Sequence, residues 1–371
     1  MRPTAIVFAL SIALNAATLH AWSTKEHILL TRLAAERLIA DPKTPPAMRQ
    51  WLERGLREPR TLADERKFLL YARIGPNPRG ADGLAFWAVM PDLEAALSGS
   101  GEKEKLVEPF GVSERLLHYV DIEFFNPDPA KRSYTDDLAN KPTLADFPRD
   151  IHDERWAKAG MLPFRVEDCY HKLVKEIAAG RLNDKPGQYP RDEHAEKWAG
   201  MLAHYLEDNT QPQHATIDYR SSFYFKDKLS APNIHSDVEY RLIDDDMDDY
   251  IPLREEFWGL LVKALDEAKD PVTTDDPWQA TVEVLLNSYD YLPMIGHAAA
   301  AAYSNSSAGS RSRLSFDAPA FYHFQGTYHG KQTTIMEMKA RQLAWAVVRV
   351  ERLWRQAWDQ AQATPSSGAS H

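Results

Sequence analysis

The chain of 371 residues contains a single cysteine, Cys169. One cysteine excludes an intramolecular disulfide, so packing or bound metal must supply the stability that disulfides give to many exported proteins. Cys169 lies in a segment with the apolar spacing of an amphipathic helix. This pattern predicts a buried small side chain rather than a nucleophile.

Positive charge and long apolar runs are also scarce. The 44 Lys and Arg residues are outnumbered by 54 Asp and Glu residues, and the formal net charge of -10 argues against a non-specific nucleic-acid-binding surface. An anionic substrate would therefore need a local source of positive charge. Beyond residues 1–21, no segment is long and apolar enough to span a membrane. The remaining composition, 44% hydrophobic and 26% charged, is that of a globular protein.

Residues 1–21 have the pattern of a signal peptide. Arg2 gives a basic start, Ala5 to Leu19 form an apolar run, and the small residue Ala21 ends a plausible cleavage site. We expect cleavage after Ala21, which would give a secreted or periplasmic protein that begins at Trp22. The alternative, an uncleaved anchor, is disfavoured because the run is shorter than the ~20 apolar residues of a spanning helix.

Helical spacing of apolar residues dominates the rest of the chain, and alternating strand patterns are scarce. The helical pattern recurs in Ile28 to Leu38, Met48 to Leu56, Phe164 to Ile177, Ala195 to Leu206, Phe257 to Leu265, Trp278 to Leu286 and Ile335 to Trp358. These segments predict an all-α protein. Without an internal repeat or a sharp change of composition, we expect one domain over residues 22–363, followed by a disordered tail over residues 364–371.

The segment after the expected cleavage site opens a helix. Ser23 and Glu26 have the spacing of a capping box, in which the side chain and backbone of the two residues bond reciprocally. In such a box the residue before the cap and the fourth helical residue come together, and these are Trp22 and His27. The free amine of Trp22 would then stand beside an imidazole, although a histidine at this place can also be a simple packing residue.

The segment from His204 to His214 carries the strongest sign of chemistry. His204 and Asp208 are four residues apart and share one face of a helix. Pro212 ends that helix and lets the backbone turn His214 back toward it. Three groups that can bind a metal therefore converge.

A second pair of the same kind follows downstream. His235 and Glu239 repeat the four-residue spacing. Each pair alone could be a surface ion pair that contributes roughly 0.2–0.5 kcal/mol. Two pairs, with a further histidine and the N-terminal tryptophan, favour a metal site instead. Nitrogen and oxygen ligands without thiolate fit zinc best, and manganese and iron remain open on ligand type.

Together these residues resemble the zinc-dependent phospholipase C and single-strand nuclease superfamily, which comprises all-helical exported phosphodiesterases with three zinc ions. The resemblance runs from Trp22 to about Asp244. It implies a single compact multi-helix domain with a trinuclear zinc site between helices. Matched position by position, the metal ligands implied are Trp22, His27, Asp92, His118, His204, Asp208, His214, His235 and Glu239.

The resemblance also implies how the ligands are shared. The first zinc ion would be held by Asp92, His118, His204 and Asp208, the second by His214, His235 and Glu239, and the third by Trp22 and His27, with Asp208 bridging the first and third. Asp92 would also be the catalytic residue that orients or deprotonates the attacking water. Asp82 is the alternative to Asp92 as the ligand.

Two features favour the phospholipase C branch of the superfamily. The last ligand is Glu239, as in the phospholipases, and residues 215–217 lack the glycine-rich continuation of the nucleases. The implied activity is hydrolysis of glycerophospholipids at a membrane surface, giving diacylglycerol and a phosphorylated head group, without an obligate protein partner. The alternatives are a zinc endonuclease specific for single-stranded nucleic acid and, more distantly, a non-catalytic zinc-binding helical protein.

Three features depart from the choline-directed phospholipases. The short spacing from Trp22 to His27 is that of the nucleases. Lys25 stands where those phospholipases have a choline-contacting glutamate, and Leu93 follows Asp92 where they have an aromatic residue. A lysine near the mouth of the site would favour an anionic or small head group.

Two later segments have several possible interpretations. Phe321 to Gly330 is rich in aromatic residues and is expected to be a loop, either a substrate-side lip or a packed loop without a role in the site. Asp244 to Asp249 lacks the glycine and terminal glutamate of an EF-hand loop, so it is interpreted as a solvated acidic turn.

Overall fold

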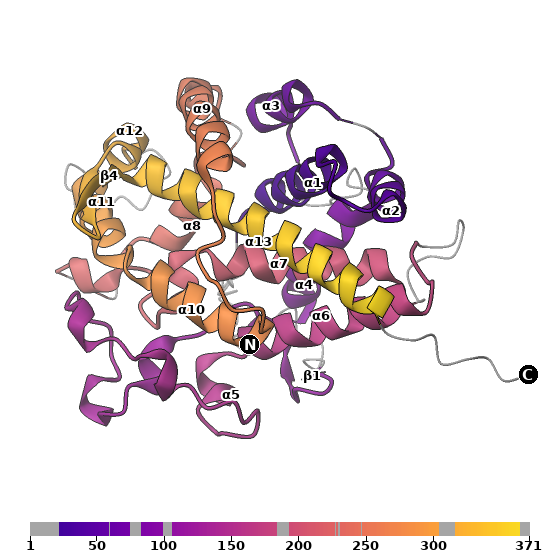
Figure 1. Cartoon of the computed structure of the whole chain (residues 1–371). Coiled ribbons are helices and arrows are strands. Elements are labelled where there is room, and N and C mark those ends of the chain that lie inside the picture. Colours follow the sequence, from indigo (N-terminus) through magenta and orange to yellow (C-terminus); the bar gives the residue numbers. More distant parts are fainter. Residues whose placement is uncertain are drawn as a thin grey trace, which may run out of the picture.

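The computed structural model describes residues 22–58, 60–74, 83–98, 106–183, 193–226, 228, 231–245, 247–303 and 316–363. The expected signal peptide, the expected tail and the alternative ligand Asp82 lie outside these residues. The described part is a compact, mostly helical fold (Figure 1). The α-helices are α1 (Thr24–Ala40), α2 (Pro46–Leu56), α3 (Leu62–Tyr71), α4 (Gly83–Ser98), α5 (Trp156–Ala159), α6 (Leu162–Ala178), α7 (Ala195–Asn209), α8 (Ile234–Tyr240), α9 (Ile251–Glu267), α10 (Pro277–Tyr289), α11 (Leu292–Tyr303), α12 (Ala318–Tyr322) and α13 (Ile335–Ala363).

Strands are confined to two small antiparallel hairpins in the described residues. β1 (Leu106–Val107) pairs with β2 (Val112–Ser113), and β3 (Gln325–Tyr328) pairs with β4 (Lys331–Thr334). Short 3-10 helices carry much of the chain between β2 and α5, beginning with η1 (Glu114–Leu117) and η2 (Ile122–Phe125). The fold class predicted from the apolar spacing, all-α, is confirmed.

Helix α7 lies at the centre of the fold and packs against α1, α4, α6, α10 and α13. Every residue of α7 except Lys197 is buried. The close approach of α4 depends on Gly200, since a Cβ there would lie 2.5 Å from the backbone oxygen of Leu84. This tight contact places the polar last turn of α7 beside the middle of α4.

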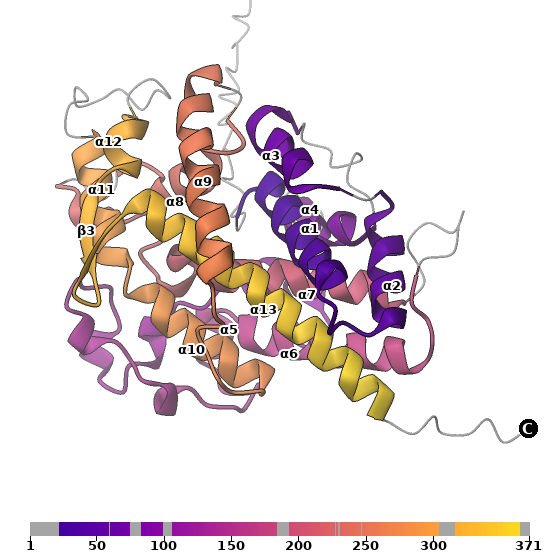
Figure 2. The same ribbon diagram turned by 45° about the horizontal axis from the view of Figure 1, so that its top comes forward.

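Helix α13 crosses the whole molecule and packs against the N-terminal helix α1 (Figures 1 and 2). It contacts α1, α6, α7 and α9. The Trp354 indole donates a hydrogen bond to the backbone oxygen of Ala199 at 3.1 Å, and Trp358 stacks on Trp51 with ring centroids 5.7 Å apart. The C-terminal third, which the sequence motifs left without a role, therefore forms part of the same core.

The seven segments with helical spacing all lie within helices, whereas α3, α4, α11 and the short helices α5 and α12 were not predicted. Helix α4 is apolar on nearly all sides and α11 is rich in alanine, so neither shows the polar face on which the periodicity depends. The aromatic segment from Phe321 is not simply a loop, because it ends α12 and forms most of the β3–β4 hairpin. Phe321 and Tyr322 are fully buried, and Tyr328 stacks on Tyr291 at 3.7 Å, so the structure favours the packed alternative.

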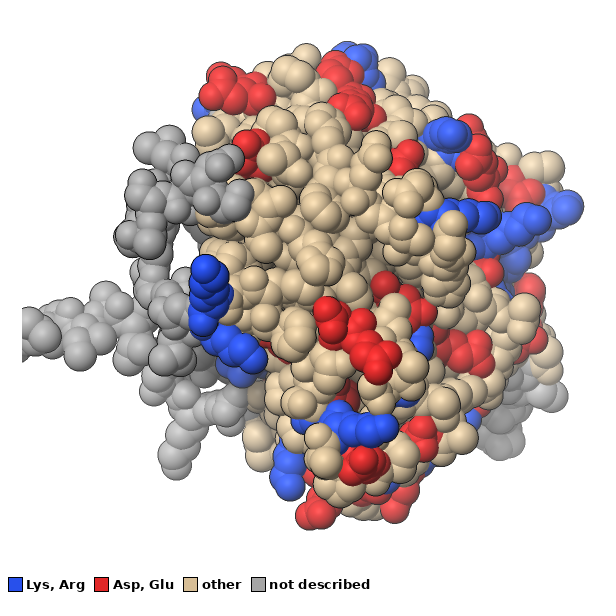
Figure 3. All heavy atoms as spheres, turned by 90° about the vertical axis from the view of Figure 1, so that its left-hand side faces the viewer, with Lys and Arg blue, Asp and Glu red and all other residues tan. Residues whose placement is uncertain are grey.

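No described helix has both the length and the apolar character needed to cross a membrane. The face of the molecule on the side of α11 and α12 has a broad area without charged side chains, with acidic and basic residues interspersed around it (Figure 3). No extended cationic surface covers this face. Any attraction for an anionic substrate on this side must therefore come from a local site.

Candidate metal centre

The last turn of α7 organises the site. His204 Nε2 lies 3.3 Å from Asp208 Oδ2, and both side chains are fully buried. The helix ends at Asn209, before Pro212, and the 3-10 helix η6 (Pro212–Ala215) then carries His214. The predicted shared face of His204 and Asp208 is confirmed, and the helix ends before Pro212 as predicted. His214 does not join that face, however, because η6 places it beside His235 and Glu239.

Asp92 and His118 join this turn from α4 and from the end of η1. His118 Nδ1 lies 3.1 Å from His204 Nε2, 2.9 Å from Asp208 Oδ2 and 3.8 Å from Asp92 Oδ1. His204 Nε2 is 3.9 Å from Asp92 Oδ1. Ligands around one tetrahedral zinc ion with bonds of 2.0–2.1 Å would be roughly 3.3–3.4 Å apart. Four side chains from three segments thus have the spacing of a single coordination shell.

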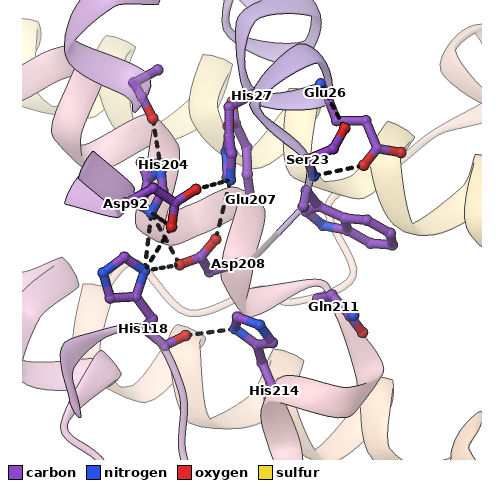
Figure 4. A network of polar contacts seen from close by, with 12 residues as sticks. Ser23, Glu26, His27, Asp92, His118, His204, Glu207, Asp208, Gln211 and His214 are labelled. Carbon is purple, nitrogen blue, oxygen red and sulfur yellow. Dashed lines mark hydrogen bonds and ion pairs between the residues drawn. The ribbon is translucent and has the colours of Figure 1, made fainter. Parts of the chain in front are cut away.

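His27 of α1 approaches the same turn beside His204, on which its ring stacks with centroids 4.1 Å apart (Figure 4). His27 Nε2 lies 3.6 Å from Asp208 Oδ1 and 3.9 Å from Asp92 Oδ2. The other oxygen, Asp208 Oδ2, faces His118 and His204. The two oxygens of Asp208 therefore face different nitrogen donors, as the oxygens of a bridging carboxylate would.

A third buried group lies on η6 and α8. His235 Nε2 is 2.8 Å from Glu239 Oε1, and His214 Nε2 is 3.6 Å from the same oxygen. The two imidazoles are stacked with centroids 5.1 Å apart. Gln211 Nε2 donates a hydrogen bond of 3.1 Å to Glu239 Oε1 and so fixes the carboxylate. The described residues therefore contain buried His, Asp and Glu groups that could hold a metal ion, and these are the residues marked out by the sequence motifs.

Two of the histidines are oriented by backbone carbonyl groups. The Nδ1 of His204 lies 2.6 Å from the oxygen of Ala88, and the Nδ1 of His214 lies 2.8 Å from the oxygen of His118. A carbonyl oxygen only accepts, so each Nδ1 carries the proton and donates it. The Nε2 lone pair of each ring is then left to face the carboxylates, as in histidine ligands of protein-bound metals.

His27 is oriented by a buried carboxylate. Its Nδ1 lies 2.6 Å from Glu207 Oε2, while Thr31 donates a hydrogen bond of 2.9 Å to Glu207 Oε1. A carboxylate that receives the outer N–H of an imidazole fixes the ring and makes its other nitrogen a better ligand. Glu207 was not predicted from the sequence. It directly precedes Asp208 in α7 and lies on the face of this helix that contacts α1.

Trp22 is anchored on the same turn of α7. Its side chain is fully buried, its indole Nε1 donates to Thr210 Oγ1 at 3.3 Å, and Thr210 donates in turn to the backbone oxygen of Glu207 at 2.8 Å. The predicted capping box of Ser23 and Glu26 is present. Trp22, directly before the box, and His27, directly after it, are therefore both held against the end of α7.

Lys25 does not stand at the mouth of the site. It is 1% exposed, and its ammonium group donates to the backbone oxygens of Leu69 at 2.7 Å and Ile243 at 3.2 Å. The hypothesis that this lysine selects an anionic head group is therefore wrong. Lys25 lies on the inner face of α1 and points toward α3 and the chain after α8. Its ammonium group is hydrogen-bonded to carbonyl groups there and does not face the cavity.

Burial and charge perturb the ionisable groups of the centre. Burial by itself would lower the pKa of His204, but the carboxylates of Asp208 and Asp92 outweigh it and raise the pKa to about 9. Burial would raise the pKa of Asp208, yet His204 and His118 hold it far below its usual range. Burial raises the pKa of Glu207 and Glu239. Without other cations, bound protons must neutralise the charge of these buried carboxylates. A divalent cation could take the place of those protons.

Several buried polar atoms of the centre lack a hydrogen bond. They include His27 Nε2, Asp208 Oδ1 and Glu239 Oε2. A buried polar atom without a partner is costly, and such atoms in a native structure call for an explanation such as an ion. The atoms concerned are nitrogen and carboxylate oxygen, which suit zinc or a similar divalent metal. The residues present therefore fit the metal that the sequence motifs predict.

A cavity of about 190 Å³ opens beside the centre. His118, His214 and His235 form one wall, and Arg115 and Ile217 belong to the rest of its lining. Arg115 and Ile217 are exposed, so the cavity connects the buried histidines with solvent. A water molecule can reach the centre by this route.

Comparison with known proteins adds no further guide to the activity. No protein-family model matches the chain, and no curated protein matches it significantly. The chemistry of the centre must accordingly be argued from its own residues.

Proposed function

We propose that the chain is a zinc-dependent phosphodiesterase, most specifically a phospholipase C. The observation that carries this proposal is the pair of imidazoles, His204 and His214, whose Nδ1 atoms are tied to carbonyl oxygens while their Nε2 atoms face buried carboxylates. A surface ion pair needs no such orientation, and a packed core histidine needs no buried carboxylates facing its second nitrogen. Metal-ligating histidines do.

Three zinc ions would complete the centre. Asp92, His118, His204 and Asp208 would hold the first, His214, His235 and Glu239 the second, and His27 with the amine and carbonyl of Trp22 the third. The two oxygens of Asp208 face the first and third groups, which supports its role as a bridge. Coordination by Trp22 requires a free amine, and hence removal of residues 1–21 by the expected signal peptidase during export.

Clustered zinc ions would polarise the phosphoryl oxygens, lower the pKa of a shared water and neutralise charge in an in-line displacement. Asp92 would accept the proton of the attacking water, and the positions of its two oxygens, 3.8 Å from His118 Nδ1 and 3.9 Å from His27 Nε2, support this role. Arg115 at the cavity rim supplies a cation for the phosphate. The chain can therefore act on an anionic phosphodiester in spite of its net charge of -10.

Two features support phospholipid as the substrate. Glu239, rather than aspartate, ends the ligand series, as the resemblance to phospholipases C implies. Ile217 lines the cavity and is 42% exposed, which gives an apolar contact for the glycerol or acyl part of a lipid. The products would be diacylglycerol and a phosphorylated head group, released outside the cytoplasm.

A single-strand nuclease is the second candidate. Tyr119 and Tyr219 also line the cavity. Aromatic rings beside a phosphodiester site can stack on unpaired bases, and such stacking contributes about 1–3 kcal/mol per base. The two candidates share the metal centre and differ only in the group that occupies the cavity.

The test compares the two substrates on one protein sample. The chain beginning at Trp22 is incubated with mixed phospholipid vesicles or with single-stranded DNA, with and without a chelator. Chelator-sensitive release of diacylglycerol supports phospholipase C, and release of nucleotides alone transfers the protein to the nuclease branch. Zinc binding without either hydrolysis would refute both and leave a non-catalytic zinc protein.

A further inference from the structure

A buried lysine on the C-terminal helix reaches the N-terminal end of the metal centre. Lys339 of α13 is fully buried. Its ammonium lies 2.6 Å from Glu26 Oε1 and donates a hydrogen bond of 2.6 Å to the backbone oxygen of Val238. It also stands 5.2 Å from the centre of the Trp22 ring. Burying an ammonium group is costly unless it is fully paired, and these contacts provide the pairing.

Lys339 contacts two segments that carry proposed ligands, the N-terminal segment and α8. On one side, Glu26 uses its second carboxylate oxygen to accept the backbone N–H of Ser23 at 2.9 Å. The ammonium thus fixes the capping box that directly follows Trp22. On the other side, Val238 immediately precedes Glu239 in α8. One side chain from the far end of the sequence joins the backbone next to two of the proposed ligands.

A general contribution to stability does not explain this choice of partners. Another fully buried cation of α13, Arg349, lies 3.4 Å from Asp270 in the loop after α9 and bonds to none of the proposed ligands. Both residues anchor α13, but only Lys339 contacts segments that carry the centre. If both residues only anchor α13, loss of either one would reduce the stability of the fold. If Lys339 also positions the centre, loss of Lys339 but not of Arg349 would weaken metal binding.

We propose that Lys339 is a positioning residue that fixes the backbone of Trp22 relative to that of Glu239, and thereby sets the metal affinity of the centre. The inference rests on the metal centre of the proposed function but not on its substrate. It gives the C-terminal helix a role that the motifs upstream of Asp249 did not suggest. The cation–π contact with Trp22 adds to the ion pair, since an ammonium over an indole ring is attracted to the face of the ring.

The test is a zinc titration against a competing chelator, made with the chain that begins at Trp22. Lys339→Met removes the charge and keeps an unbranched side chain, while Lys339→Arg restores the charge. Arg349→Met is the matched control, because it removes an equally buried cation from the same helix. We expect Lys339→Met to bind its weakest zinc ion about tenfold less tightly, which is the lower end of the range found when a direct hydrogen-bond partner of a metal ligand is lost. Lys339→Arg should recover part of this loss, and Arg349→Met should titrate as the wild type does.

A loss of folding in Lys339→Met is covered by a second variant. The double change Glu26→Gln with Lys339→Met removes both buried charges at once, which proteins often tolerate. The weaker zinc binding should persist in this variant. An unchanged titration in the folded variants, or an equal loss in Arg349→Met, would overturn the proposal. The zinc titration does not depend on hydrolysis. A wild-type protein that binds zinc normally but hydrolyses neither substrate would therefore count against the proposed function and not against the role of Lys339.

Discussion

The carboxylate of Glu207 offers the sharpest test of how the centre is built. Its Oε2 accepts the Nδ1 proton of His27 at 2.6 Å, and its Oε1 is held by Thr31 at 2.9 Å. Glu207→Gln keeps the shape and one hydrogen bond but removes the charge that makes the imidazole a stronger ligand. Loss of such a partner weakens metal binding by about 10–100-fold. This corresponds to about 1.4–2.7 kcal/mol.

We expect Glu207→Gln to fall at the lower end of that range, about tenfold, because its amide oxygen can still accept from His27. The metal-free protein should lose little stability, since burial already raises the pKa of Glu207 and penalises its charge. Chelator competition measures the affinity, and urea unfolding of the metal-free protein measures the stability. Thr31→Val is the control, because it releases the other oxygen and leaves the contact with His27 intact. The reasoning is refuted if Glu207→Gln binds zinc as the wild type does, or if Thr31→Val loses as much.

Three further predictions concern the scaffold. Burial and the nearby Glu65 raise the pKa of Glu36 to about 8. The folded state therefore holds the Glu36 proton more tightly than the unfolded state does. The resulting stabilisation of the fold is full below the unfolded-state pKa and is lost as the pH rises through about 8. Glu36→Gln should therefore reduce the fall of the melting temperature over that pH range, and an unaltered pH profile would contradict this. Burial raises the pKa of Cys169 to about 12, so a thiol reagent at neutral pH should modify it only after unfolding, and rapid modification of the folded chain would disprove its burial. Gly200→Ala should lower the free energy of unfolding in urea by about 1–3 kcal/mol, because its Cβ would lie 2.5 Å from the α4 backbone. Gly259→Ala, which meets no atom within 4 Å, should raise it by about 0.5–1 kcal/mol, and a gain in both would contradict the packing argument.

Much of the centre could be predicted because its ligands obey local spacing rules. His204 with Asp208 and His235 with Glu239 lie one helical turn apart, so a helix must place each pair on one face. Pro212 ends α7 for steric reasons that act within a few residues. The capping box at Ser23 depends on the same short range.

The contacts between distant segments could not be predicted in this way. Glu207 becomes a partner of His27 only because α1 packs on α7, and Lys339 meets Glu26 only because α13 packs on α1. Asp92 could be named from resemblance alone, since the surrounding helix α4 is too uniformly apolar to show which face it buries. Lys25 was misplaced for a related reason: its position in the sequence indicates nearness to the centre but not the direction of the side chain.

The most direct test of the central claim is anomalous X-ray diffraction at the zinc edge on crystals of the chain beginning at Trp22. The account predicts three zinc peaks: one among Asp92, His118, His204 and Asp208, one among His214, His235 and Glu239, and one beside His27 and the Trp22 amine. Crystals grown with zinc that show no peak within these three groups would contradict it.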